Sequence, residues 1–120
     1  MNKENNQKTM KTIIILSISL FLAISIKAQK IYSVQYASQA DIKVYVVKYE
    51  SQCDLKVYKV DYESQAKENK GLWFFTKYES QAKFTIFFVD YESQADLKIY
   101  FVDYASQAGW RKKSLQYLLY

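Results

Sequence analysis

The chain has 120 residues, half of them hydrophobic and 18% aromatic, with no histidine, no proline and a formal net charge of +5. This length allows one domain at most, and the hydrophobic content is too high for a disordered tail. Without histidine the sequence has neither a Ser-His-Asp triad nor an imidazole metal ligand, so acid–base chemistry would fall to carboxylates or tyrosines.

The first predicted element, residues 1–28, is an N-terminal extension followed by a secretory signal peptide. Met10 and Lys11 give a basic start, residues 13–26 form an apolar run, and Ala28 is a small residue before a cut at Gln29. A permanent anchor is the alternative, but a membrane-spanning helix needs about 20 apolar residues. We therefore expect a secreted or periplasmic protein that has no stable membrane span after cleavage.

Removal of the leader changes the charge of the chain. Residues 1–28 hold four lysines and one glutamate, so the mature part keeps 13 of the 17 basic and 11 of the 12 acidic residues. Acidic and basic residues alternate along this part, which is typical of a mixed soluble surface. We expect no nucleic-acid partner, because the remaining basic cluster at residues 111–113 is short.

A five-residue phrase, Tyr-Glu-Ser-Gln-Ala or a near copy of it, organises the mature chain. The copies begin at Tyr36, Tyr49, Tyr62, Tyr78, Tyr91 and Tyr104. The steps between them are 13, 13, 16, 13 and 13 residues, and the longer step contains an insertion at Lys67–Gly71. Insertions in regular arrays fall in surface loops, so we predict one there.

Runs rich in Val, Ile, Tyr and Phe separate the phrases and predict β-strands. They occupy residues 41–49, 54–62, 72–78, 83–91 and 96–104. Apolar bulk falls on both alternating sides of each run, so we expect both faces of the strands to be largely covered. The Ser-Gln-Ala-Asp segments favour turns, and we expect their serine and glutamine groups to bond to their equivalents in other copies or to neighbouring backbone, in a shared network.

A unit this short becomes stable only by packing on its neighbours. The mature chain accommodates close to seven units, the last being Gly109–Tyr120, a final strand or a cap. The predicted fold of residues 29–120 is a single all-β domain, a compact closed arrangement of about seven short repeat strands, because closure removes exposed sheet edges. A short-coil β-solenoid and a meander of hairpins are the alternatives.

The repeat resembles a known family. Tandem Tyr-x-Ser-Gln-Ala-Asp-x-Lys-Val-Tyr units that close on Ser-Gln-Ala-Gly-Trp, a basic segment and Leu-Leu-Tyr are similar to a small family of unknown function from bacteria and some viruses. The match runs from Tyr36 to Tyr120, and the ending at Ser106–Trp110 is its most specific part. The resemblance implies a deep seven-crossing torus knot, although protein chains in general avoid knots. It implies no activity, and the insertion departs from its regular pattern.

The recurring polar residues are interpreted as structural. Glutamates share one repeat position at Glu50, Glu63, Glu79 and Glu92, whereas a catalytic pair needs two carboxylates in different environments. Aspartates and lysines also recur together and predict cross-strand ion pairs; the residues are Asp41, Asp54 and Asp96 with Lys43, Lys56 and Lys98. No calcium-loop pattern accompanies them, and we expect neither a metal nor another cofactor.

Two further positions have a structural and a functional interpretation. The row formed by Tyr45, Tyr58 and Tyr100 carries phenylalanine in other copies, which favours packing, although an exposed row would stack on sugars or bases. Cys53 stands where the other copies carry alanine. It is interpreted as a small buried residue, with an intermolecular disulfide as the alternative.

The candidate binding surface comprises residues that break the repeat. Trp73 and Trp110 interrupt it, Lys70 lies in the inserted loop, and Arg111 begins the basic cluster. Core packing or capping is the alternative role for both tryptophans. We predict an exported, monomeric, non-catalytic module, structural or binding, with a glycan or protein partner. A small carboxylate-dependent hydrolase acting through Glu68 in the inserted loop, and a toxin or immunity factor, remain alternatives.

Overall fold

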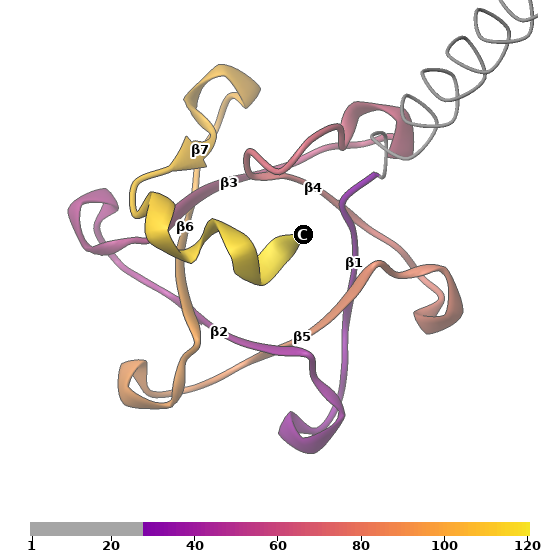
Figure 1. The fold of residues 1–120 in the computed structure, drawn as a ribbon, viewed down its shortest axis with the longest axis horizontal. Coiled ribbons are helices and arrows are strands. Elements are labelled where there is room, and N and C mark those ends of the chain that lie inside the picture. Colours follow the sequence, from indigo (N-terminus) through magenta and orange to yellow (C-terminus); the bar gives the residue numbers. More distant parts are fainter. Residues whose placement is uncertain (1–27) are drawn as a thin grey trace, which may run out of the picture.

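The fold is a closed barrel of six short strands with a seventh strand on its rim, in a computed structural model that describes residues 28–120 (Figure 1). The predicted signal peptide lies outside the described residues except for Ala28. The strands are β1 (Lys30–Ser33), β2 (Ile42–Val46), β3 (Leu55–Lys59), β4 (Leu72–Phe75), β5 (Phe84–Phe88), β6 (Leu97–Phe101) and β7 (Gly109–Trp110). Over residues 28–120, no helix has the length and apolar character needed to cross a bilayer.

Short 3-10 helices alternate with the strands. They are η1 (Ala37–Gln39), η2 (Glu50–Gln52), η3 (Glu63–Gln65), η4 (Glu79–Gln81), η5 (Glu92–Gln94), η6 (Ala105–Gln107) and the longer η7 (Lys113–Leu119). The first six coincide with the repeated phrase, which confirms that the phrase is a turn. We call each of these six turns, together with the tyrosine before it, a tip; the tips project outward around the barrel (Figure 1).

The order of strands around the barrel differs from their order in the chain. The ring runs β4-β1-β5-β2-β6-β3 and closes on β4, and every pair within it is parallel. The predicted compact, closed all-β arrangement is confirmed, with six strands in the ring and β7 antiparallel on β3. The solenoid alternative is wrong, because successive strands would then lie side by side, whereas β1 and β2 are separated by β5.

The chain travels around the barrel in two interleaved laps. Strands β1, β2 and β3 take alternate places in the first lap, and β4, β5 and β6 fill the places between them (Figure 1). A step of two places around a six-membered ring returns to its start after three strands, so the fourth strand cannot repeat the regular step. β4 instead takes the place directly beside β3. The insertion at Lys67–Gly71 lies in this irregular connection and forms the predicted surface loop.

Each regular connection is a crossover that passes outside one intervening strand. Parallel strands require such a return, normally made by a dozen or more residues with a helix. Here residues 34–41 connect β1 to β2 through η1, which packs on β5. In the same way η5 packs on β2 and η6 on β3. The tips therefore cover part of the outer surface of the barrel.

The core fills the inside of the barrel. Alternate strand residues point inward and are fully buried; they include Ile31, Val44, Leu55, Val57, Trp73, Ile86, Leu97 and Ile99. The outward row that contains Tyr45, Tyr58 and Tyr100 is half-buried beneath the crossovers. Coverage of both faces is thus complete on the inside and partial on the outside.

The C-terminal segment closes one end of the barrel. Helix η7 lies across the ring, with the C-terminus over its centre (Figure 1). Leu119 is fully buried, and its carbonyl accepts a hydrogen bond from Gln29 Nε2 at 3.1 Å. Asn69 Nδ2 donates to the Gln116 carbonyl at 2.8 Å. Because Gln29 and Asn69 precede strands, η7 covers the end where the strands begin, and the last unit supplies both a final strand and a cap.

The expectation that the recurring aspartates form ion pairs with lysines is wrong. Within residues 28–120 these aspartates have no lysine partner; each accepts a hydrogen bond at 2.9–3.0 Å from the backbone N–H of the second residue of the neighbouring strand. The bonds are Thr85 N–H to Asp41, Lys98 N–H to Asp54 and Lys43 N–H to Asp96. A backbone N–H at a strand start needs an acceptor, and the carboxylate supplies it.

Two of the six recurring glutamines bond to the backbone of their own tip. Gln65 Oε1 accepts from the backbone N–H of Tyr62 at 3.1 Å, and Gln107 Oε1 accepts from that of Tyr104 at 3.3 Å. A side chain that caps its own turn satisfies a local donor with little loss of entropy. Bonds to neighbouring backbone were one of the two expected kinds of partner, and these two bonds do not link separate copies.

Candidate functional site

The candidate binding surface predicted from the sequence is divided by the fold. Trp73 lies inside the barrel with none of its surface exposed, and its ring meets Phe75 edge-on at 6.1 Å between centroids. Its assignment to a surface is wrong, because the inserted loop ends at Gly71 and the strand then resumes its inward alternation. The alternative interpretation of Trp73, core packing, is the one that the structure bears out.

The other three residues of that surface lie near the C-terminal cap. The Trp110 indole N–H donates to the Asn69 carbonyl at 3.0 Å, which ties β7 to the inserted loop. Arg111 Nη1 donates to the carbonyls of Glu50 and Cys53 at 3.0 and 3.2 Å. Lys70 is exposed in the loop, 3.7 Å from Glu68. Trp110 and Arg111 thus fasten the end of the chain, and the four residues form no common site.

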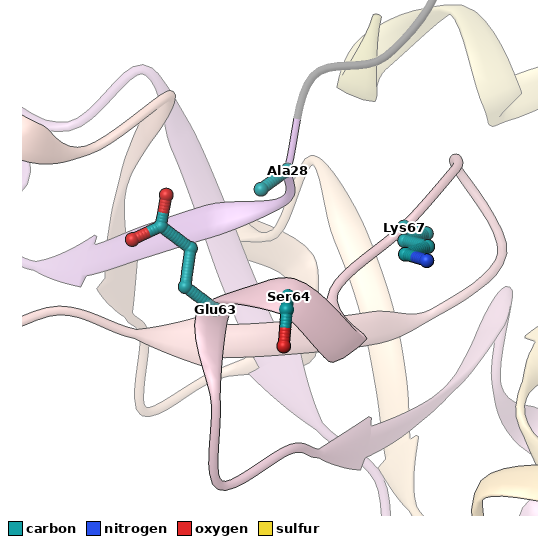
Figure 2. Close-up of a pocket in the computed structure, with 4 residues that line it drawn as sticks. All are labelled: Ala28, Glu63, Ser64 and Lys67. Carbon is teal, nitrogen blue, oxygen red and sulfur yellow. The ribbon is translucent and has the colours of Figure 1, made fainter.

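A shallow groove of about 450 Å³ lies beside the start of β1 and is lined by Ala28, Glu63, Ser64 and Lys67 (Figure 2). The polar ends of its side chains point in different directions and do not converge on one point (Figure 2). Glu63 also bonds Lys30 at 2.6 Å. An acid–base pair needs two titratable groups that reach the same part of the substrate, and the described residues of this groove are not arranged in that way.

Three of the four repeated glutamates form ion pairs on the outside of the barrel. Glu50 lies 3.6 Å from Lys56, and Glu92 lies 3.3 Å from Lys98, in each case six residues further along the chain. Glu63 lacks a lysine six residues on, because the insertion begins there, and it pairs with Lys30 of β1 instead. Exposed pairs of this kind contribute about 0–1 kcal/mol each.

The most prominent surface feature is the set of tyrosines that open the phrases. Their exposures are 60–69%, and they are Tyr36, Tyr49, Tyr62, Tyr78, Tyr91 and Tyr104. Each precedes its 3-10 turn in extended conformation, as Tyr49 does with φ −124° and ψ 138°. The tyrosine side chain therefore lies exposed at the start of each tip. Glutamate, serine and glutamine side chains lie next to it in the sequence.

Sequence reasoning missed these tyrosines as a surface and considered the strand tyrosines instead. A signal was available, since each phrase tyrosine is followed by polar residues on the turn, whereas Tyr45, Tyr58 and Tyr100 stand within apolar runs. A large aromatic residue flanked by turn-forming polar residues has no neighbouring apolar surface to cover it.

Cys53 is buried at the end of η2, as expected for a residue in the alanine position. Burial raises the pKa of its thiol, and the neighbouring Arg111 opposes this in part. A buried, protonated thiol is a poor nucleophile. In this position it packs as a small apolar residue and is shielded from an intermolecular disulfide.

These features define a class, a tandem-repeat parallel barrel whose chain winds twice around the ring and is closed by its own C-terminus. The chain belongs to the septoil knot family: the family model described as "7(1) septoil knot domain" matches residues 28–111. The resemblance to seven-crossing torus-knotted β-proteins is thereby confirmed. Comparison with curated proteins and with solved structures gave no match.

Proposed function

We propose that this protein is an exported, non-catalytic module that binds glycans of the cell envelope or extracellular space through its six tips. The observation that carries the proposal is the repeated exposure of the phrase tyrosines at 60–69% of their surface. A tyrosine ring offers a flat apolar face and a hydroxyl, which together suit the C–H face and the hydroxyl groups of a sugar. Export is proposed from the leader-like sequence in residues 1–28.

The arrangement of the tips favours binding to a polymer with many like units. Six similar tips surround one barrel. When one unit of a polymer binds to one tip, the effective concentration of the polymer's other units rises near the neighbouring tips. Weak contacts at single tips then combine into useful affinity without any deep pocket. The cap and the closed barrel fix the tips relative to one another, so the protein loses little conformational entropy when a ligand binds.

The experiment measures binding of the purified exported protein to a panel of immobilised polysaccharides. Replacing Tyr49, Tyr62 and Tyr91 together with alanine should weaken binding by about tenfold or more, since avidity falls steeply when contact points are lost. The control is Tyr117→Ala, because Tyr117 is 67% exposed and lies on η7 away from the tips. It should bind as the wild type does.

Two results would contradict the proposal. One is a wild-type protein that binds no polysaccharide of the panel, and the other is a triple variant that binds as tightly as the wild type. Export is measured separately by the intact mass of the protein from the envelope or the medium. A species that still carries residues 13–26 would contradict cleavage before Gln29.

A further inference from the structure

One repeat position holds a lysine at the start of four strands, and three of these lysines have a glutamate partner. The distances are 2.6 Å from Lys30 to Glu63, 3.6 Å from Lys56 to Glu50 and 3.3 Å from Lys98 to Glu92. Lys43 is the fourth, and within residues 28–120 no carboxylate lies within ion-pair distance of its ammonium group. The reason is in the sequence, since the residue six positions before Lys43 is Ala37, where four of the other five copies carry glutamate.

The other copy with alanine at this position does not leave a cation unpartnered. Ala105 is followed six residues later by Arg111 in place of lysine. The Arg111 guanidinium donates to the carbonyls of Glu50 and Cys53 and fastens the end of the chain. The loss of glutamate at position 37 therefore has no compensation of the kind found at position 105.

A groove of about 290 Å³ lies at this place, between the tips of η1 and η5. It is lined by Ala37, Lys43, Phe87, Val89 and Gln94. The two tips are neighbours around the ring, and β5 and β2 run between them (Figure 1). The groove thus combines one cation, one amide and an apolar floor, a mixture typical of ligand sites in proteins.

At two equivalent junctions the protein itself supplies a carboxylate partner for the cation. Between η2 and η6 the corresponding cation is Lys56, which pairs with Glu50, and between η5 and η2 it is Lys98, which pairs with Glu92. The floor residue at these two junctions is Tyr100 or Tyr45, where the groove has Phe87. The groove beside Ala37 is a repeat junction from which one carboxylate has been removed.

Asp96 does not take the place of the missing glutamate. Asp96 accepts a hydrogen bond from the Lys43 backbone N–H at 2.9 Å, so its carboxylate is engaged at the strand start. Asp54 makes the same bond to the Lys98 N–H, and Lys98 still pairs with Glu92. The Lys43 ammonium therefore remains available to an anion from outside.

We propose that this groove binds the carboxylate of an acidic sugar, a uronic acid unit, which occupies the position that glutamate holds at the other junctions. Lys43 bonds the carboxylate, the Gln94 amide bonds ring hydroxyl groups, and the Phe87 ring lies against the apolar face of the sugar. A volume of about 290 Å³ is at the lower limit of ligand pockets and suits one sugar unit. The proposal rests on the proposed glycan-binding function, to which it adds a preferred ligand.

The decisive variant is Ala37→Glu, which restores the repeat and places a carboxylate beside Lys43. Binding of methyl glucuronoside and of oligogalacturonate is measured by NMR titration and calorimetry on the cleaved, folded protein. The wild type should show shifts at Ala37, Lys43 and Gln94, and should bind the acidic oligosaccharide at least about tenfold more tightly than a neutral oligosaccharide of equal length. Ala37→Glu and Lys43→Gln should each lose that preference.

Controls separate a blocked site from a damaged fold. Ala37→Glu should unfold at the same denaturant concentration as the wild type or at a higher one. The new glutamate would form with Lys43 the same kind of ion pair that Glu50 forms with Lys56. Lys56→Gln removes a lysine that already has a partner and should leave binding of the acidic sugar unchanged. Equal loss of binding in Lys56→Gln and Lys43→Gln would overturn the proposal.

The remaining outcomes distinguish this proposal from the proposed function. If the tip variant loses all glycan binding while Ala37→Glu retains the preference for acidic sugar, the function stands and the groove is not the site. If inorganic sulfate alone shifts the same signals with the same affinity as the glucuronoside, the groove selects any anion, and the assignment to a sugar is overturned. If the glucuronoside shifts the groove signals but no polysaccharide binds, the groove is supported and the six-tip function falls.

Discussion

Replacing Gly71 with alanine should damage the barrel where its first lap meets its second. Gly71 has φ +87°, a conformation that costs a residue with a side chain about 1–3 kcal/mol. An added Cβ would also lie 2.2 Å from the carbonyl oxygen of Lys56 and 3.3 Å from Leu55 Cδ1. The first contact is with backbone, so β3 and the start of β4 must separate.

That separation acts on a short seam. Strands β3 and β4 pair over two residues, and the Gly71 carbonyl accepts a hydrogen bond from the Tyr58 N–H at 2.9 Å. Loss of this bond adds about 1 kcal/mol to the backbone strain. We expect Gly71→Ala to lower the free energy of unfolding by about 3–5 kcal/mol, which is a large part of the 5–15 kcal/mol typical of a domain.

The matched control is Gly109→Ala. Gly109 also has an unfavourable φ, +154°, but an added Cβ there meets no atom within 4 Å. It should cost about 1–3 kcal/mol from the backbone alone. Urea titration followed by circular dichroism, with incubation long enough for both directions to agree, measures the two values. Equal costs for the two variants would refute the contact between Gly71 and Lys56 as the source of the difference.

Three further predictions test the cap, the thiol and the strand starts. Leu119→Ala removes a fully buried side chain and should lower the free energy of unfolding by about 2–5 kcal/mol. Tyr117→Ala, on the exposed side of η7, should change the free energy of unfolding by less than about 0.5 kcal/mol. Similar values for the two variants in urea titration would contradict the capping role of η7. Cys53 should react slowly with iodoacetamide at pH 8 in the folded protein and rapidly in denaturant, because burial raises the pKa of its thiol. Since the pKa is higher in the folded state, the stability that the protonated thiol contributes is present at neutral pH and is lost as the pH rises through that raised pKa. Asp54→Ala should cost about 1–3 kcal/mol by leaving the Lys98 N–H without its acceptor, and a cost equal to that of exposed Asp61→Ala would contradict this.

Much of the architecture follows from the equivalence of the repeats. Their composition and spacing predict strands, turns at the phrase, a loop at Lys67–Gly71 and closure of the sheet. The order of strands around the barrel does not follow, because near-identical strands offer near-identical edges and the pattern of apolar residues specifies the inward face without specifying the neighbour. The two laps become visible only when the pairing of β1 with β4 and β5 is known.

The burial of Trp73 was predictable from the same equivalence. The fifth residue before each phrase tyrosine is Ile31, Val44, Val57, Trp73, Ile86 or Ile99, and all six are completely buried. Counting back from Tyr78 places Trp73 in this row in spite of the insertion. The hydrogen bonds of the aspartates were harder to predict from the sequence. Their partners are backbone N–H groups, which every residue type except proline carries.

Three departures from the regular repeat bear on this argument, and the fold accounts for two of them. The insertion before β4 is required because a step of two places cannot continue beyond three strands in a ring of six. The change from Asp-x-Lys to Gly-Trp-Arg at residues 109–111 is required because the last unit must turn back antiparallel and cap the barrel. The change from glutamate to Ala37 serves neither purpose, since the same turn forms at η2 with glutamate in place. In a body built from equivalent parts, a difference without a structural reason is where a ligand is to be sought, and here it leaves Lys43 facing an open groove.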